Sequence, residues 1–148
     1  LGFFVAQLLL LVTVYMAVHT LWIRSGDVSN LRTGTYTVIP IFSIISKLGG
    51  ELVAIFSVMG GLMSGSLLFF MGARNATFLI SRGFGIPGFE QIAFAMGRNA
   101  LTGAITAVIG GLLVGFVALL IGYLWAEAII VLVDIAESLT DEERLARD

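Results

Sequence analysis

Long apolar stretches separated by short polar segments dominate this chain. The longest, Leu101 to Val133, contains one charged residue, Glu127. An apolar stretch of about 18 or more residues can cross the hydrocarbon core of a bilayer, roughly 30 Å thick, as a helix. A helix satisfies its own backbone hydrogen bonds, which lipid cannot do. The pattern therefore predicts an all-α integral membrane protein.

Three transmembrane helices are predicted within a single membrane domain, residues 1–148. The first span covers about 1–23 and carries no charged side chain. Trp22 lies near its end, where interfacial aromatic residues are common. Arg24 to Tyr36 is rich in Ser, Gly, Asp, Asn and Thr, and this composition predicts a polar connection.

The second span is predicted at about 51–72. Thr37 to Gly50 before it is mostly apolar but contains Pro40, Lys47 and a glycine pair, so we predict an interfacial lead-in there. Ala73 to Ala100 follows the span and keeps many apolar residues. We expect that connection to lie on the membrane surface or against a partner, because an exposed apolar segment of this size favours aggregation.

The third span is predicted at about 103–125, and its helical pattern continues as an amphipathic extension over about 126–140. Glu127, Asp134, Glu137 and Asp141 are spaced seven, three and four residues apart. These offsets place the four acids on one face of a helix. The last helix is therefore expected to leave the membrane with a charged face in water.

Composition agrees with a membrane location and narrows the function. Hydrophobic residues make up 58% of the chain and charged residues 12%, against about 25% charged in soluble domains; mean hydropathy is +1.03. The net charge of −2 and the scattered basic residues give no basis for binding nucleic acid. With no cysteine and one histidine, disulfides, thiolate catalysis and multi-histidine metal sites within the chain are excluded.

Small residues recur at four-residue spacing in the second and third spans. Such stripes let helix backbones approach closely, which drives helix association in lipid. The predicted packing residues are Ser57, Gly61, Gly65, Gly103, Ala107, Gly111 and Gly115, with Ala118 and Gly122 near the same line. We expect the two stripes to pack against each other; homo-oligomerisation and docking to another subunit are the alternatives.

An ion pair is predicted at one membrane face. With three spans, the start of the second and the end of the third lie on the same side, which brings Lys47 and Glu51 to the level of Glu127. A carboxylate within the membrane costs at least about 2.5 kcal/mol, so we expect Lys47 to pair with Glu127. A proton or ion relay through Glu127, or its contact with a partner subunit, is the alternative.

His19 is the candidate cofactor ligand. An imidazole on a membrane helix can bind haem iron or a chlorophyll magnesium, although an interfacial anchor or hydrogen-bond donor is the simpler interpretation. No cofactor is predicted on balance. Ser, Thr and Tyr occur without a base at a recognisable spacing, so the sequence predicts no enzyme.

Two stretches resemble a known family. They are Val38-Ile-Pro-Ile through Lys47 with the glycine-rich span after it, and Leu124-Trp-Ala-Glu-Ala-Ile-Ile-Val-Leu-Val-Asp-Ile-Ala-Glu137. Together they resemble a small bacterial helical-hairpin membrane family known only as a domain of unknown function. The resemblance covers about residues 37–140, with a longer loop and an extra first span here. It implies a bacterial inner-membrane location and no catalysis.

These observations favour a non-catalytic accessory or scaffold subunit of a larger membrane complex, in contact with lipid and with other membrane subunits. Two alternatives remain open. One is a small homo-oligomeric channel or transporter component, with Glu127 or Lys47 as its gate. The other is a pigment- or haem-binding membrane subunit that uses His19.

Overall fold

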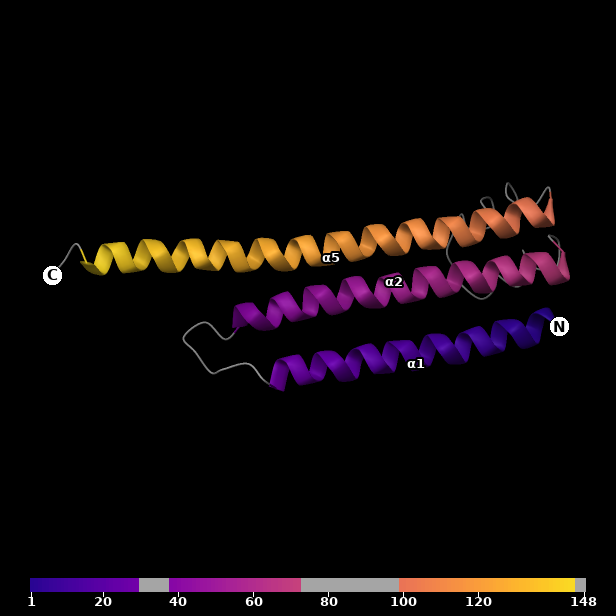
Figure 1. Cartoon of the computed structure of the whole chain (residues 1–148), viewed down its shortest axis with the longest axis horizontal. Helices are drawn as coiled ribbons and strands as arrows, with labels where there is room; N and C mark the ends of the chain where they lie inside the picture. The colour runs from indigo at the N-terminus through magenta and orange to yellow at the C-terminus, as the bar shows by residue number, and fades with distance from the viewer. Residues whose placement is uncertain (30–37, 73–98, 146–148) are drawn as a thin grey trace.

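The computed structural model describes residues 1–29, 38–72 and 99–145, and these form three helices (Figure 1). They are α1 (Gly2–Ser29), α2 (Val38–Met71) and α5 (Ala100–Leu145), and no strand occurs in the described parts of the chain. Each helix contains a segment long and apolar enough to cross a membrane, namely Gly2–Ser29, Pro40–Met71 and Ala100–Ile135. The predicted all-α fold with three such helices is therefore confirmed, and the chain is an integral membrane protein.

Helix α1 is longer than the predicted first span, so the prediction of a connection starting at Arg24 is wrong. The helix continues through Ser29. Ser25 and Ser29 donate hydrogen bonds from their hydroxyls to the carbonyls of Trp22 and Gly26, at 2.9 and 2.8 Å. Residues that usually favour turns are thus accommodated within the helix, because their hydroxyls bond back to its preceding turn.

Helix α2 is continuous from Val38, so the described residues of the predicted interfacial lead-in belong to the same helix as the second span. Pro40 is the third residue of the helix, where a missing N–H costs nothing because the first four N–H groups have no intrahelical acceptor. The helix ends at Met71, and Gly72 follows with a φ of 77°. A glycine in this left-handed conformation is a common helix terminator, since it has no Cβ to clash.

Helix α5 begins after Asn99, whose carbonyl accepts a hydrogen bond from the Gly103 N–H at 2.9 Å. Asn is a favoured residue at this capping position. The helix runs to Leu145, which confirms that the third span continues as a long extension. The predicted surface segment, residues 73–98, lies outside the described residues.

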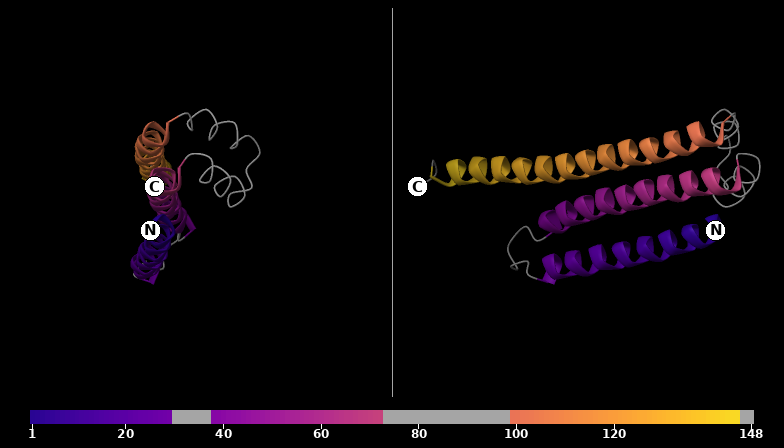
Figure 2. Two further views of the ribbon diagram at one scale, coloured as in Figure 1. Left: turned by 90° about the vertical axis from the view of Figure 1, so that its right-hand side faces the viewer. Right: turned by 45° about the vertical axis from the view of Figure 1, so that its right-hand side comes forward.

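The three helices form a single layer with α2 in the middle (Figures 1 and 2). Helix α2 packs against both α1 and α5. Gly2 lies against Phe70 and Met71, so the start of α1 and the end of α2 meet at one end of the layer, where α5 also begins (Figure 1). At the other end α2 extends past α1, and α5 extends past both.

The α2–α5 contact is made by small residues and by backbone. A Cβ built on Gly61 would lie 2.6 Å from the Ala107 carbonyl oxygen and 3.0 Å from the Gly111 Cα. A Cβ on Gly122 would lie 2.9 Å from the Gly50 Cα. Since these are backbone atoms that cannot move aside, the helices approach this closely only because the residues are glycines.

Candidate functional site

A cluster of charged and polar side chains joins all three helices. Arg24 of α1 donates from Nε to Oε2 of Glu51 on α2 at 3.0 Å, and from Nη2 to the other carboxylate oxygen. The side chains of Arg24 and Glu51 are only 19% and 18% exposed. This two-point pairing of a guanidinium with a carboxylate is the strong form of an ion pair, because it fixes direction as well as distance.

Tyr123 of α5 completes the cluster. Its hydroxyl donates to Oε1 of Glu51 at 2.7 Å and accepts a hydrogen bond from Arg24 Nη2 at 3.1 Å. Arg24 also donates from Nη1 to Oδ2 of Asp27, one turn along α1, at 2.8 Å. One guanidinium therefore reaches groups on all three helices.

Lys47 lies beside the cluster, one turn before Glu51 on α2. Its Nζ is 5.7 Å from the centroid of the Tyr123 ring, within the range of a cation–π interaction. Arg24 and Lys47 carry two positive charges, and Glu51 and Asp27 two negative charges. The cluster is formally neutral, which lowers the cost of holding it near lipid.

The depth of the cluster follows from helix geometry. At about 1.5 Å per residue, Arg24, Glu51 and Tyr123 each lie about 30 to 35 Å from the aligned helix ends at Gly2, Met71 and Ala100. This distance matches the hydrocarbon thickness of a bilayer, roughly 30 Å. The cluster and the aligned ends are therefore spaced as the two boundaries of a bilayer would be, and we take the level of the cluster as one membrane boundary.

Two serines of α2 extend this polar contact beyond the boundary. The Ser46 hydroxyl donates to the Gly122 carbonyl at 3.1 Å, and the Ser43 hydroxyl donates to the Ala126 carbonyl at 3.4 Å. Ala126 is fully buried. Helices α2 and α5 therefore remain packed together past the level at which α1 ends.

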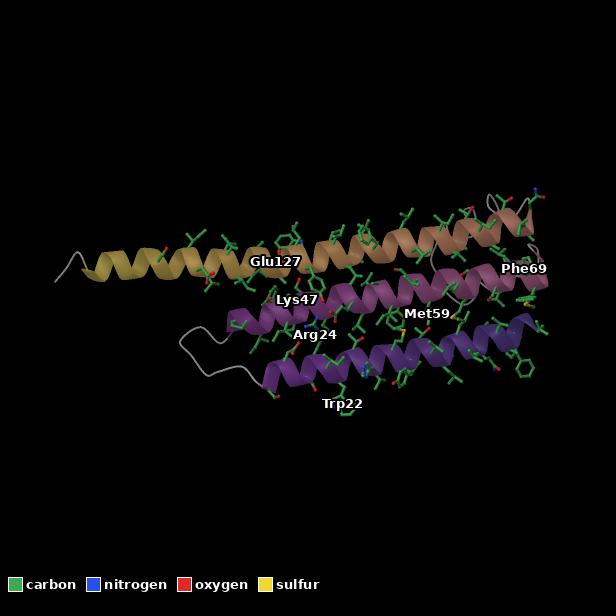
Figure 3. The ribbon with its side chains drawn as sticks, in the orientation of Figure 1. Trp22, Arg24, Lys47, Met59, Phe69 and Glu127 are labelled. Carbon is green, nitrogen blue, oxygen red and sulfur yellow. The ribbon has the colours of Figure 1, made fainter. Side chains whose placement is uncertain are left out.

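The predicted ion pair between Lys47 and Glu127 does not form in the described residues, and this prediction is wrong. Glu51 pairs with Arg24 instead. Lys47 is directed at the ring of Tyr123, and Glu127, one turn further along α5, is exposed (Figure 3). The physical reason is the direction of Glu127: it lies about 140° around α5 from the glycines that face α2. Glu51 has Arg24 as its partner because α1 continues past Ile23.

Most of the other predicted site residues belong to the α2–α5 contact. Gly61, Gly65, Gly111 and Gly115 lie against backbone atoms of the facing helix, including those of Ser57, Ala104, Ala107 and Ala54. Gly103 is buried. The sequence pattern missed Ala54, Ala104 and Gly50. The sequence assigns Gly50 to the lead-in, yet a Cβ there would lie 3.0 Å from the Ala118 carbonyl oxygen.

His19, the candidate pigment ligand, lies on an exposed part of α1. Its ring is stacked on that of Tyr15, with centroids 5.9 Å apart and planes 5° apart. In the described part of the chain, no three His, Cys, Asp or Glu side chains are grouped so that they could hold a metal ion. The structure brings His19 together with Tyr15 and not with the charged cluster.

Arg24 and Tyr123 are the cluster residues that the sequence did not predict. Arg24 and Asp27 have the i, i+3 spacing of a helical ion pair, directly after an uncharged span. That signal could have placed them on the helix. Among the described residues every buried side-chain N or O atom has a hydrogen-bond partner, so the cluster is well suited to fixing the three helices at the membrane boundary.

In comparisons with protein families, curated proteins and solved structures, no match to this chain was found.

Proposed function

We propose that the chain is a non-catalytic accessory or scaffold subunit of a larger membrane protein complex in a bacterial inner membrane. The observation that supports this proposal is the single layer of helices (Figure 2). Helix bundles normally surround a core of apolar side chains, whereas a layer one helix thick leaves both broad faces free for neighbours.

The small size of the buried residues supports the same interpretation. Few apolar side chains are buried among the described residues, and most of these are alanines: Ala6, Ala54, Met59, Leu68, Ala104 and Ala126. Large side chains instead point outward, such as Phe56 of α2, which is 58% exposed. Lipid can cover these faces, and so can helices of another subunit.

The charged cluster fits a scaffold role because it holds the layer in one arrangement. Arg24, Glu51 and Tyr123 connect three helices through mutual hydrogen bonds. A neutral and internally paired cluster stabilises a surface on which a partner can dock. The bacterial location rests on the resemblance to the hairpin family and stays a prediction.

The test is to isolate the full chain gently from its native membrane and to analyse it by native gel, absorption spectrum and mass spectrometry. A photoreactive phenylalanine analogue in place of Phe56 would show what covers the broad face. Comigration with a defined larger complex and cross-linking to a different membrane protein is the expected result.

Two other outcomes would overturn this proposal. A small colourless homo-oligomer, with cross-links only between copies of the chain, would favour the channel or transporter component. Bound pigment or haem whose spectrum is lost in His19→Ala would favour the cofactor-binding subunit.

A further inference from the structure

The outer edge of α5 carries an apolar stripe that nothing in the described structure covers. Helix α5 lies at one edge of the layer (Figure 2). Its contact with α2 uses Gly111, Gly115 and Gly122. About half a turn away from those glycines, a row of side chains repeats at intervals of four, three and four residues: Leu113, Val117, Leu120, Leu124, Ala128, Val131 and Ile135.

The stripe continues where lipid no longer reaches. Tyr123 marks the membrane boundary, and Ile135 lies about 18 Å beyond it along the helix. Leu124, Val131 and Ile135 are still 69%, 55% and 51% exposed. Water meets these side chains there, so the hydrophobic effect, which is weak between helices inside lipid, drives this part of α5 to associate.

The charged side chains of α5 lie beside the apolar stripe and not within it. Glu127 and Asp134 lie to one side of it, separated from its centre by about 60° to 80° around the helix. The positions on its other side are Trp125 and Leu132, which are 61% and 66% exposed. Outside the membrane α5 thus has three faces, one for α2, one acidic and one apolar.

The apolar face is large enough for a stable interface. Eight of its side chains are each half or more exposed: Leu113, Val117, Leu120, Leu124, Trp125, Val131, Leu132 and Ile135. Together they expose on the order of 800 Å², partly within the membrane and partly beyond Tyr123, and this sets the upper limit of what one copy can bury here; one partner of a standard interface buries about as much.

We propose that this face is the interface between two copies of the chain, whose α5 helices lie parallel and in register. Two copies inserted with the same orientation are related by a two-fold axis along the membrane normal, so each stripe residue meets its own equivalent. Leu124, Val131 and Ile135 are compatible with such self-contact, and the two acidic flanks do not face each other.

The spacing also specifies the shape of the pair. The stripe repeats every eleven residues, from Leu113 to Leu124 to Ile135 and from Leu120 to Val131. An eleven-residue repeat corresponds to about 3.67 residues per turn and gives a slightly right-handed supercoil. The two helices can therefore stay in contact over the whole stripe. This inference does not depend on the proposed accessory role, because a dimer can exist with or without further subunits.

The chain has no cysteine, so single cysteines can report on this interface. Leu124→Cys, Val131→Cys and Ile135→Cys are placed on the stripe of the full chain, and the membranes are oxidised. Ile130→Cys and Phe42→Cys are matched controls, since Ile130 and Phe42 are 42% and 60% exposed but lie off the stripe. A disulfide forms only where the two Cβ atoms approach to about 4 Å.

We expect disulfide-linked dimers at the three stripe positions and several-fold less product at the two controls. A second measurement is native mass spectrometry of the double variant Val131→Glu, Ile135→Glu. Its mass should fall by half while its helical circular dichroism is kept, because both side chains point outward.

Three results would overturn the proposal: equal cross-linking at all five positions, no dimer at the stripe positions, or cross-linking of the stripe to a different protein. An unchanged dimer mass in the folded double variant would do the same.

Discussion

Helix α2 is held to its two neighbours in different ways. Against α5 it uses backbone contacts between glycines at several successive turns, such as Gly61 on Gly111 and Gly50 on Gly122. Against α1 it uses a few small buried residues, namely Gly2, Ala6 and Thr13 of α1, and the pairing of Arg24 with Glu51 at the membrane boundary. The α2–α5 contact is spread over several turns of both helices, whereas the α1–α2 contact depends strongly on the pairing of Arg24 with Glu51.

The difference indicates how this layer is stabilised. Close backbone approach gains dispersion contacts at each turn, so no single residue of the α2–α5 contact carries it. Helix α1 contacts α2 less extensively than α5 does, and the charged cluster must supply much of its attachment. We therefore expect α1 to detach before α2 and α5 separate, and the following predictions test this order.

The largest effect is expected from Arg24→Leu. Removing one partner of a mostly buried ion pair leaves the other charge uncompensated, and the expected loss in free energy of unfolding is about 3 kcal/mol. The loss should be confined to α1. In detergent micelles, a cysteine at Thr13, which is 5% exposed, should become reactive towards a membrane-permeant thiol reagent, whereas a cysteine at Ala54 should stay protected.

The matched control for this prediction is the double variant Arg24→Leu, Glu51→Leu. It removes both charges and should recover most of the lost stability, since an apolar pair of similar volume replaces a buried ion pair at little cost. If the double variant were as unstable as the single one, the uncompensated charge would not be the cause.

A smaller loss is expected from Gly61→Ala, which tests the other contact. The added Cβ would lie 2.6 Å from the Ala107 carbonyl oxygen, so the two helices must move apart. Overpacking of this kind costs about 1 to 3 kcal/mol, measured by detergent-induced unfolding. Gly60→Ala is the control: a Cβ there meets nothing within 4 Å, and its better helix propensity should leave stability equal or raised by up to about 1 kcal/mol.

The two contacts also differ in how far the sequence predicts them. Residues such as Gly61 and Gly111 repeat along one face, so their spacing alone indicates helix packing, and the structure places them at the α2–α5 contact. Arg24 and Glu51 are 27 residues apart in the chain, and no periodicity connects them. Their pairing depends on where α1 ends.

The conformational preferences of single residues predict the wrong end for α1. Ser25, Gly26 and Ser29 favour a turn when each is considered alone, yet the helix continues through them. Gly50 is a second example: its local preference suggests an interruption of the helix, but in the structure it lies in the contact between α2 and α5. At Gly50 the contact with α5 outweighs local preference, whereas at Ser25 and Ser29 the hydroxyls bond back to carbonyls of α1 itself.

An intermediate effect is expected from Tyr123→Phe. The change removes the hydroxyl that donates to Glu51 at 2.7 Å and accepts from Arg24 at 3.1 Å, but it keeps the ring under Lys47. The expected loss is about 1 kcal/mol, the usual net value of a hydrogen bond that is partly exposed. Because Tyr123 lies on α5, accessibility of the cysteine at Thr13 should rise less than in Arg24→Leu. An equal rise would mean that α1 depends on α5 as much as on α2.

The smallest effects concern Lys47 and Glu127, and they distinguish the observed cluster from the ion pair that the sequence predicts. In the structure Lys47 lies over the Tyr123 ring at 5.7 Å, and Glu127 is exposed. Lys47→Gln should therefore cost about 0.5 to 1 kcal/mol, the value of an exposed cation–π contact. A double-mutant cycle with Glu127→Gln should give a coupling energy near zero, within about 0.3 kcal/mol, because the two side chains share no partner.

The same cycle on Arg24 and Glu51 should give a coupling of about 2 kcal/mol or more, since these groups contact each other directly. A large coupling between Lys47 and Glu127 would instead indicate that in the membrane Lys47 turns from the Tyr123 ring towards Glu127, and the attachment of α1 would then depend less on one cluster than the present contacts imply.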